Sequence, residues 1–241
     1  MSLVTPSGGL VYHLRALRHA DALWAPFRAE LAAWLARSLP LADELILVGP
    51  SAGHCLPTDR LSQVPRILAL EPDPLARLLL RKRLAPSRVE SEPRDLLIEP
   101  LLNGESGLAA LLERRPHVPV LFCNVLGQVH FALSDEQHER FQQGFRARLL
   151  PALAGRSWAS FHDRWSLDWA SGAAPIPASR EFERLPSDAE LAEAWFGSGK
   201  EPVTALDHGT TALFPEAWPR TYLSWQLTPS ALHVVEALAR V

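Results

Sequence analysis

Apolar residues recur three or four positions apart from Leu10 to Leu39, which is the period of an amphipathic helix. Pro26 interrupts this stretch. A proline removes a backbone donor inside a helix but suits the first turn of a new one, so the pattern predicts two helices that meet near Ala25. We expect residues 1–40 to form a helical cap over the remainder of the chain.

Short apolar runs that end in turn residues follow, and they predict buried strands. These runs are ELILVG from Glu44, RILALEP from Arg66, PVLFCNV from Pro119 and SWASFHD from Ser157. Helical periodicity lies between them, at 73–84, 107–114 and 134–149, the last with Ser134 as N-cap. Alternation of strand and helix predicts an α/β fold with a doubly wound, mostly parallel sheet, a Rossmann-like architecture.

The last third of the chain has a different character. Residues 170–186 lack a period and indicate a loop, and Ser187 opens a capping box for a short helix that ends at Gly197. VTAL, TTALF and TYLSWQL suggest later strands, including an antiparallel pair, whereas the segment 230–241 is predicted as helix because Thr228-Pro229 can start one. We expect one domain over 1–241, with its core at 41–241 and a loop-rich insertion around 170–200.

Composition narrows the function classes. A chain of 241 residues can bury one substantial core, and its net charge of -3 gives no general positive field for bulk nucleic-acid binding. No secretory signal and no run of roughly 20 apolar residues is visible, so we expect a protein of the cytoplasm without membrane contact. Neither H-E-x-x-H nor a Cys/His quartet occurs, so no metal site is expected. The oligomeric state is not encoded in any pattern that we can read.

The stretch VGPSAGHC, from Val48 to Cys55, is the most informative part of the sequence. A strand that enters a small-residue turn before a helix lets backbone amides approach a ligand closely. The turn matches G-x-S-x-G, the nucleophile elbow of serine hydrolases, with Ser51 as nucleophile and Asp163 or Asp168 and His208 as partners. An elbow serine follows several earlier strands, however, and mostly helical residues precede this one, which argues against a hydrolase.

The same turn resembles the first glycine-rich motif of the class I S-adenosylmethionine-dependent methyltransferases. In that family a D/E-x-G-x-G-x-G pattern follows the first strand and contacts the methionine part of the cofactor; Gly49 and Gly53 match the outer glycines, and Ser51 stands at the middle one. Leu47 occupies the position of the family's acid. Neither the NAD fingerprint nor the P-loop pattern is matched, so a dinucleotide or ATP site is less favoured.

The resemblance continues downstream and covers roughly residues 44 to 165. Glu71 ends the next predicted strand, 18 residues after Gly53, where a carboxylate can accept hydrogen bonds from both ribose hydroxyls. The resemblance further implies that Asp95 lies near the adenine amino group and that Asn124, at the end of the fourth strand, faces the methyl group that is transferred. S-adenosylmethionine is therefore the expected cofactor, held by Gly49, Ser51, Gly53, Glu71, Asp95 and Asn124.

The acceptor side is read from SWASFHDRW, which contains the candidate catalytic residues His162 and Asp163. His162 could take a proton and Asp163 could orient it, with Trp158, Trp165 and Trp169 as a substrate wall. The alternative is that the three tryptophans pack in the core. Contacts from Tyr12, His13 and Arg15 of the N-terminal cap are a further possibility.

These observations favour methyl transfer from S-adenosylmethionine to a small or medium-sized acceptor that the sequence does not identify. An in-line displacement mainly requires positioning of the acceptor and exclusion of water, so a sparse active site is sufficient. Leu47 and Ser51 depart from the family's pattern and leave a second hypothesis open. In that hypothesis the chain is an inactive methyltransferase-like fold that serves as a binding module.

Overall fold

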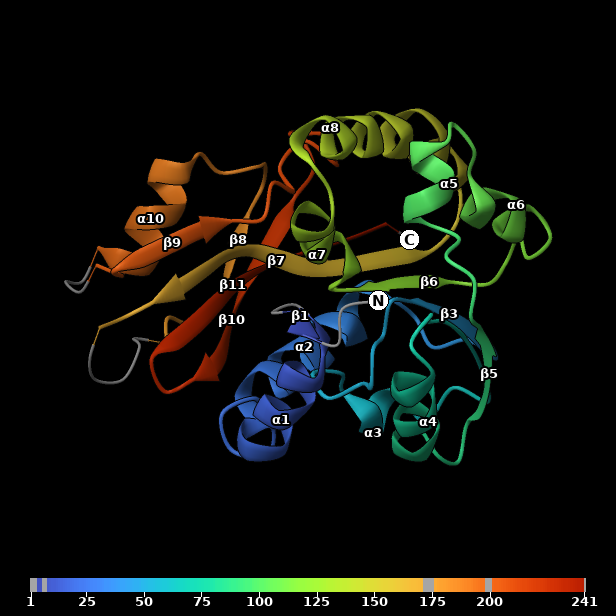
Figure 1. The fold of residues 1–241 in the computed structure, drawn as a ribbon, viewed down its shortest axis with the longest axis horizontal. Helices are drawn as coiled ribbons and strands as arrows, with labels where there is room; N and C mark the ends of the chain where they lie inside the picture. Colours follow the sequence, from blue (N-terminus) through green and yellow to red (C-terminus); the bar gives the residue numbers. More distant parts are fainter. Residues whose placement is uncertain (1–3, 6–7, 171–175, 198–200, 241) are drawn as a thin grey trace.

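A computed structural model describes residues 4–5, 8–170, 176–197 and 201–240. Its main feature is a nine-stranded sheet with the order β5-β4-β3-β6-β7-β11-β10-β8, in which β9 also pairs with β7 (Figure 1). The strands are β3 (Glu44–Val48), β4 (Arg66–Leu70), β5 (Arg88–Glu92), β6 (Val120–Cys123), β7 (Trp158–Asp168), β8 (Arg180–Phe182), β9 (Thr204–Asp207), β10 (Arg220–Thr228) and β11 (Ala231–Arg240). A separate two-stranded sheet joins β1 (Val4–Thr5) and β2 (Gly8–Gly9).

The strands β5, β4, β3, β6 and β7 run parallel, and β11, β10, β8 and β9 pair antiparallel to their neighbours. The chain proceeds outward from β3 to β4 and β5, and then returns to add β6 on the other side of β3. This reversal makes the carboxyl ends of β3 and β6 the topological switch point, where open α/β sheets bind their ligands. The predicted α/β, Rossmann-like fold is confirmed, with a mixed sheet in which, among the described residues, four strand pairs are parallel and four are antiparallel.

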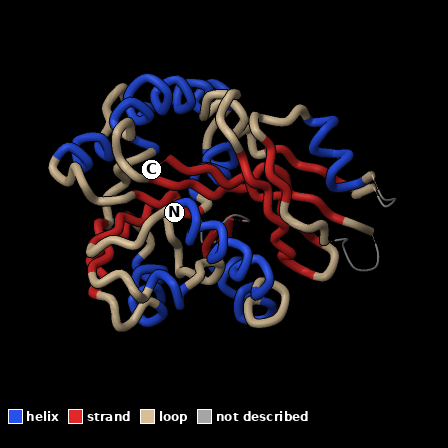
Figure 2. Tube along the Cα trace, turned by 180° about the vertical axis from the view of Figure 1, so that it is seen from behind, coloured by secondary structure: helices blue, strands red, loops and turns tan. Residues whose placement is uncertain are grey.

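Helices cover both faces of the sheet (Figures 1 and 2). On one face lie α1 (Leu10–His19), α2 (Ala25–Ser38), α3 (Thr58–Leu61) and α4 (Pro74–Arg83). On the other lie α5 (Ile98–Leu102), α6 (Gly107–Glu113), α7 (Val125–Ala132), α8 (Asp135–Gly144), the π-helical turn η1 (Phe145–Leu149) and α9 (Leu150–Ala152), while α10 (Asp188–Phe196) packs near β8 and β9. Pro26 stands in the first turn of α2, as predicted.

The prediction of a helix over residues 230–241 is wrong. This segment is strand β11, which lies between β7 and β10, and Val234, Val235 and Ala237 are buried in it. Thr228-Pro229 belongs to the hairpin turn between β10 and β11 rather than to a helix start. A strand with neighbours on both edges is apolar on both faces, so it lacks the alternation that would distinguish it from a buried helix.

Two smaller differences concern the preceding residues. TTALF, at 210–214, forms turns instead of a strand. The predicted loop at 170–186 contains β8, which adds an edge strand to β10, and its residues 171–175 lie outside the described part of the chain.

Strand β7 contains a β-bulge that changes which residues share a face. Val235 pairs with Asp163 and the adjacent Val234 pairs with Trp165, so Arg164 is an extra residue in β7. Alternate residues of a regular strand share a face, and a bulge shifts that parity by one position. As a result Asp163 and Ser166, three positions apart, lie on the same side of the sheet. Arg164 is 2% exposed and forms ion pairs with Asp188 and Asp207.

Candidate active site

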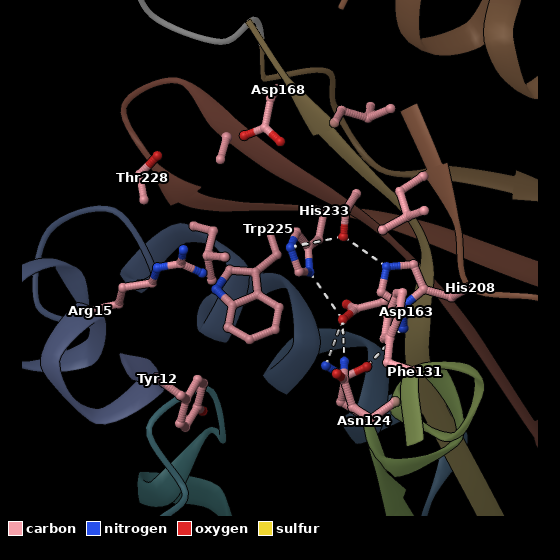
Figure 3. A pocket seen from close by; sticks show the side chains of 16 residues that line it. Tyr12, Arg15, Asn124, Phe131, Asp163, Asp168, His208, Trp225, Thr228 and His233 are labelled. Atoms are coloured by element: carbon pink, nitrogen blue, oxygen red, sulfur yellow. Dashed lines mark hydrogen bonds and ion pairs between the residues drawn. The ribbon is translucent and has the colours of Figure 1, made fainter. Parts of the chain in front are cut away.

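A cavity of about 530 Å³ opens beside the carboxyl end of β6 and the second half of β7 (Figure 3). Helix α1 contributes Tyr12 and Arg15, and α7 and the turn before it contribute Asn124, Gln128 and Phe131. The opposite wall comes from β7, β9, β10, β11 and the residue after β9. The cavity therefore collects side chains from segments far apart in sequence, with aromatic rings and titratable groups facing one another.

Asp163 is a charged group in the wall of this cavity, and it is fully buried. Its Oδ2 accepts hydrogen bonds from Asn124 Nδ2 at 2.9 Å and from Gln128 Nε2 at 2.8 Å, while its backbone N–H donates to Asn124 Oδ1 at 2.8 Å. Burial would raise the pKa of this carboxyl, but nearby His233 and His208 outweigh burial and lower the pKa of Asp163 to about 2. Asp163 is thus a carboxylate at neutral pH.

Two backbone features bring the partners of Asp163 into place. Asn124 has a φ of 59°, a left-handed conformation that Asn tolerates better than most residues, and it directs the chain from β6 into α7. Gly127 lets α7 contact β7 directly, because a Cβ on it would lie 2.7 Å from Asp163 N and 2.9 Å from Asp163 O. Asn124 and Gln128 are one helical turn apart and both reach Asp163 across this contact.

A serine hydroxyl lies between two imidazoles on the same wall. Ser166 Oγ is 2.7 Å from His208 Nε2 and 3.1 Å from His233 Nε2. His208 Nδ1 lies 2.6 Å from the carbonyl oxygen of Gly127, and His233 Nδ1 lies 3.0 Å from Asp163 Oδ2. Burial lowers the pKa of His208, an effect that the charge of Asp163 opposes. Figure 3 shows Asp163, His208 and His233 close to one another in the wall of the cavity.

The glycine turn after β3 has a left-handed backbone at three positions. Gly49, Ser51 and Gly53 have φ values of 64°, 49° and 71°. Ser51 keeps the left-handed conformation although it is not glycine, at a cost of roughly 1 kcal/mol. A Cβ on Gly49 would lie 2.5 Å from Val125 Cβ, so only glycine allows this turn to lie against the start of α7.

Glu71, at the end of β4, lies against the same turn. Its Oε2 accepts a hydrogen bond from Ser51 N at 2.8 Å, and its Oε1 accepts one from Asp73 N at 3.0 Å. Burial raises the pKa of Glu71, and the amides of Asp73 and Ser51 oppose that rise. Each carboxylate oxygen has a further lone pair, so the group can still accept hydrogen bonds from a ligand.

The structure brings some of the predicted site residues together and separates others. Asn124 and Asp163 line the cavity, whereas the glycine turn and Glu71 form a neighbouring cluster connected to it through the contact of Gly49 with Val125. Asp95 accepts hydrogen bonds from the amides of Leu97, Ile98 and Glu99, so it caps the start of α5 and does not reach the cavity.

His162 lies on the opposite side of β7 from Asp163. Its Nδ1 is 2.9 Å from Ser160 Oγ, its Nε2 is 3.6 Å from Glu236 Oε1, and its ring stacks on Phe214. The side chain is fully buried and is not part of the cavity wall. Successive residues of a strand point to opposite faces, so the adjacent candidates His162 and Asp163 could not both face one site.

The partners proposed for a serine hydrolase do not assemble around Ser51. His208 contacts Ser166 and Gly127 and lines the cavity, which Ser51 does not. Asp168 lines the cavity at its exposed edge. The geometry therefore does not bring Ser51, an aspartate and His208 into one catalytic array.

Helix α1 stands between the cavity and the glycine turn. Tyr12 lines the cavity and packs its ring edge-on against His54, with 5.7 Å between the ring centroids. His13 Nδ1 lies 3.3 Å from His54 Nε2. Burial, followed by the charge of Arg83, lowers the pKa of His54 to about 4, so this imidazole is neutral at neutral pH.

The tryptophans of the SWASFHDRW segment belong to apolar clusters. Trp158 packs with Phe214 beneath α8, and Trp165 and Trp169 pack with α10. The indole that does line the cavity is Trp225 of β10, and its Nε1 has no hydrogen-bond partner within the described residues. Trp225 and His233 cannot be nominated from the sequence, because their place depends on the pairing of β10 with β11, which the helix predicted over 230–241 excludes.

Gln128 and Ser166 are two further site residues that the sequence analysis does not nominate. Gln128 follows Asn124 by one helical turn, which is a signal that could have been used. Ser166 was hidden by the bulge at Arg164, since strict alternation assigns it to the face of His162.

Comparison with protein-family models and with curated proteins found no match. Comparison with solved structures found S-adenosylmethionine-dependent methyltransferases, the group that the motifs resemble. The sugar N-methyltransferase KedS8 from Streptoalloteichus is 15% identical, with a TM-score of 0.40 and coverage of 100% of this chain and 76% of that one. DhpI, solved with SAM, is 18% identical, with a TM-score of 0.40 and coverage of 96% and 94%. A SAM-dependent methyltransferase from Anabaena variabilis is 14% identical, with a TM-score of 0.46 and coverage of 98% of both chains.

Within the described ranges no helix is long and apolar enough to cross a bilayer. The same part of the chain groups no three His, Cys, Asp or Glu side chains in a way that could hold a metal ion.

Proposed function

We propose that this protein transfers a methyl group from S-adenosylmethionine to a small molecule held in the cavity beside β7. The observation that carries the proposal is the switch point between β3 and β6. The left-handed turn Gly49–Gly53, the buried acid Glu71 and Asn124 follow the ends of the adjacent strands β3, β4 and β6, and Asn124 bonds to Asp163 within the neighbouring β7. Ligands of open α/β sheets bind in this crevice.

The residues fit the cofactor in three respects. The turn allows backbone amides to approach a ligand, and Glu71 retains lone pairs for two ribose hydroxyls. The buried carboxylate of Asp163 and the ring of Tyr12 suit a positively charged sulfonium. In addition, His54 Nδ1 beside the turn is buried and lacks a hydrogen-bond partner among the described residues.

Each group then has a distinct task. The turn and Glu71 would hold the nucleoside, and Asn124 and Gln128 fix Asp163 at the wall of the acceptor cavity. Bound S-adenosylmethionine supplies an already activated methyl group, so the protein chiefly positions the acceptor and excludes water. Tyr12 lies between turn and cavity and would have to move aside for a ligand that spans both. Asp95 is engaged in capping α5, and we assign it no contact with the cofactor.

Calorimetric titration with S-adenosylmethionine and S-adenosylhomocysteine tests the proposal. We expect saturable binding by the wild type and a loss of roughly tenfold or more in affinity for Glu71→Ala, since a charged hydrogen-bond acceptor contributes about 1.5–3 kcal/mol. Glu90→Ala is the matched control, because Glu90 lies on the neighbouring strand β5 with its side chain 55% exposed.

The outcomes separate the hypotheses. Circular dichroism first establishes that Glu71→Ala is folded, because the change also removes the acceptor of two amides. Unchanged affinity in a folded Glu71→Ala protein would exclude Glu71 from the cofactor site. Absence of binding by the wild type would overturn methyl transfer and favour the inactive binding module.

A further inference from the structure

We infer that Ser166, held between His208 and His233, accepts the proton that the methyl acceptor loses and passes it to an imidazole. This inference rests on the proposed function, and it assigns the residues that remove the proton from the methyl acceptor. It implies an acceptor with an N–H or O–H group at the reacting atom.

Three neighbouring strands create the array. Ser166 of β7 lies directly opposite His233 of β11 in the register of the sheet, and it faces β9 on its other edge. His208 follows the last residue of β9, and its N–H donates to the carbonyl of Arg164. Directly opposed side chains on one face of a sheet are within contact distance, so the pairing of β7 with β11 holds the hydroxyl beside His233. The backbone hydrogen bond from His208 to Arg164 holds the second ring near the same hydroxyl.

The hydrogen positions in this array follow from its fixed neighbours. His208 Nδ1 must carry a hydrogen, because it lies 2.6 Å from the carbonyl oxygen of Gly127. His233 Nδ1 lies 3.0 Å from the carboxylate of Asp163, which favours a hydrogen there as well. If both imidazoles are neutral, each Nε2 is a bare lone pair that faces Ser166 Oγ.

Ser166 has one hydroxyl hydrogen and cannot donate it to two nitrogens at once. The array with two neutral imidazoles is therefore one hydrogen short, and uptake of one proton completes both contacts. The positive charge would be shared by two rings beside the Asp163 carboxylate. Of the groups involved, Ser166 and His233 are partly exposed toward the cavity, while His208 and Asp163 are buried.

The proposed step balances as follows. The acceptor X–H donates to Ser166 Oγ, and its X–H electron pair forms the new X–CH₃ bond. The S–CH₃ bond breaks with its electron pair left on sulfur, which gives neutral S-adenosylhomocysteine. The acceptor's proton passes to Ser166 Oγ as the serine's own hydrogen moves to Nε2 of His208 or His233. The serine ends neutral, and the array ends with one imidazolium.

A role for Ser166 as a nucleophile fits the geometry less well. The Ser166 hydroxyl contacts the His233 imidazole, and that imidazole contacts the Asp163 carboxylate. Serine hydrolases connect the same three groups in this way. Acyl transfer also needs free backbone N–H groups near the hydroxyl to bind an oxyanion. Ser166 instead lies within β7, which is paired with β11 on one edge and β9 on the other.

Charged and aromatic side chains from each element that packs on the array surround the two imidazoles. Asp163 on β7 faces both imidazoles, and Asp207 on β9 acts on His208. Phe131 of α7 covers His208 at 4.8 Å between ring centroids, and Trp225 of β10 packs on His233 at 5.5 Å. Arg15 of α1 is the cationic side chain in the cavity wall.

NMR titration of the imidazole nitrogens tests the inference without any substrate. In the wild type we expect His208 and His233 to titrate in shared steps, because groups that exchange one proton are coupled. Ser166→Ala should uncouple the two curves, and Ser166→Thr, which keeps the hydroxyl, should restore the coupling. Ser160→Ala is the matched control, since Ser160 is also on β7 and contacts His162 on the opposite face at 2.9 Å. Superimposable curves in wild type and Ser166→Ala would overturn the array.

Two further measurements separate this inference from the proposed function. With S-adenosylmethionine and a panel of small amines, phenols and alcohols, Ser166→Ala should lower kcat about a hundredfold while leaving cofactor affinity unchanged. Wild-type turnover in that variant would refute the role of Ser166. Stoichiometric labelling of Ser166 by a fluorophosphonate would make it a nucleophile and refute the relay. Failure of the wild type to bind S-adenosylmethionine would sink the proposed function but would leave the NMR result standing.

Discussion

Substitution of Gly127 by alanine should disturb the candidate site by pushing α7 away from β7. The added Cβ would lie 2.7 Å from Asp163 N and 2.9 Å from Asp163 O. A comfortable carbon contact is about 3.5 Å, so the helix has to retreat by roughly 0.7 Å. Both partners are backbone, and neither can rotate out of the way.

The size of the effect follows from the hydrogen bonds that cross this contact. Asn124 Nδ2 and Gln128 Nε2 lie 2.9 and 2.8 Å from Asp163 Oδ2, and a shift of roughly 0.7 Å takes both beyond the usual range. Hydrogen bonds to a charged acceptor contribute about 1.5–3 kcal/mol each, part of which relaxation recovers. Alanine has a better helix propensity than glycine, which stabilises the folded variant by about 1 kcal/mol. We expect a net loss of about 2 kcal/mol in the free energy of unfolding.

Urea unfolding followed by circular dichroism measures this loss. Gly107→Ala is the matched control: Gly107 begins α6, and the nearest atom to its added Cβ is a side-chain methyl of Leu96 at 3.2 Å. That methyl can move, so the control should be neutral or slightly stabilised. If Gly127→Ala is as stable as Gly107→Ala, the packing of α7 on β7 is not as tight as described and the account of Asn124 and Gln128 fails.

Two other outcomes follow from the buried charges. The pKa of Asp163 is about 2, below its value of about 4 in an unfolded chain, so its contribution of roughly 2 kcal/mol is present above pH 4 and lost as the pH falls toward 2. Asp163→Asn should remove that part of the acid dependence of the unfolding free energy, and an unchanged pH profile would contradict the assignment. Glu236 is buried against Arg220, Tyr222 and His162. Glu236→Gln leaves the Arg220 cation uncompensated and should cost about 3–5 kcal/mol in urea unfolding, without altering S-adenosylmethionine affinity. A weaker affinity would connect the far face of β7 to the site.

The sequence predicted the parallel half of the fold because its local signals agree with its tertiary structure. ELILVG, RILALEP and PVLFCNV are short apolar runs that end in turns, and each became a strand of the parallel sheet. The β11 segment was mistaken for a helix because a strand buried on both faces has no alternation. Because of that wrong prediction His233 was not a candidate for the site, since a residue on a helix would not be expected to lie opposite Ser166.

The candidate site was only partly predictable for a similar reason. Asn124 follows a strand directly, so its place at the sheet edge is local information, and the same holds for Glu71. Asp163 was nominated together with its neighbour His162, and strand alternation separates the two. The contacts of Ser166 depend on the bulge in β7 and on two strands that come later in the chain. Long-range register of this kind leaves no periodic trace in the sequence.

The bulge at Arg164 divides β7 into two parts that can change independently. β11 pairs with both parts, but the residues before the bulge have β6 on their other edge and the residues after it have β9 there. Substitutions in the second part would remodel the cavity wall while the first part keeps its register with β6. Deletion of Arg164, in contrast, would remove the extra residue and leave a regular strand, in which Trp165 and Ser166 keep their partners Val234 and His233. Ser166 would stay on the face of Asp163, and the loss would be the two ion pairs that connect β7 to Asp188 and Asp207.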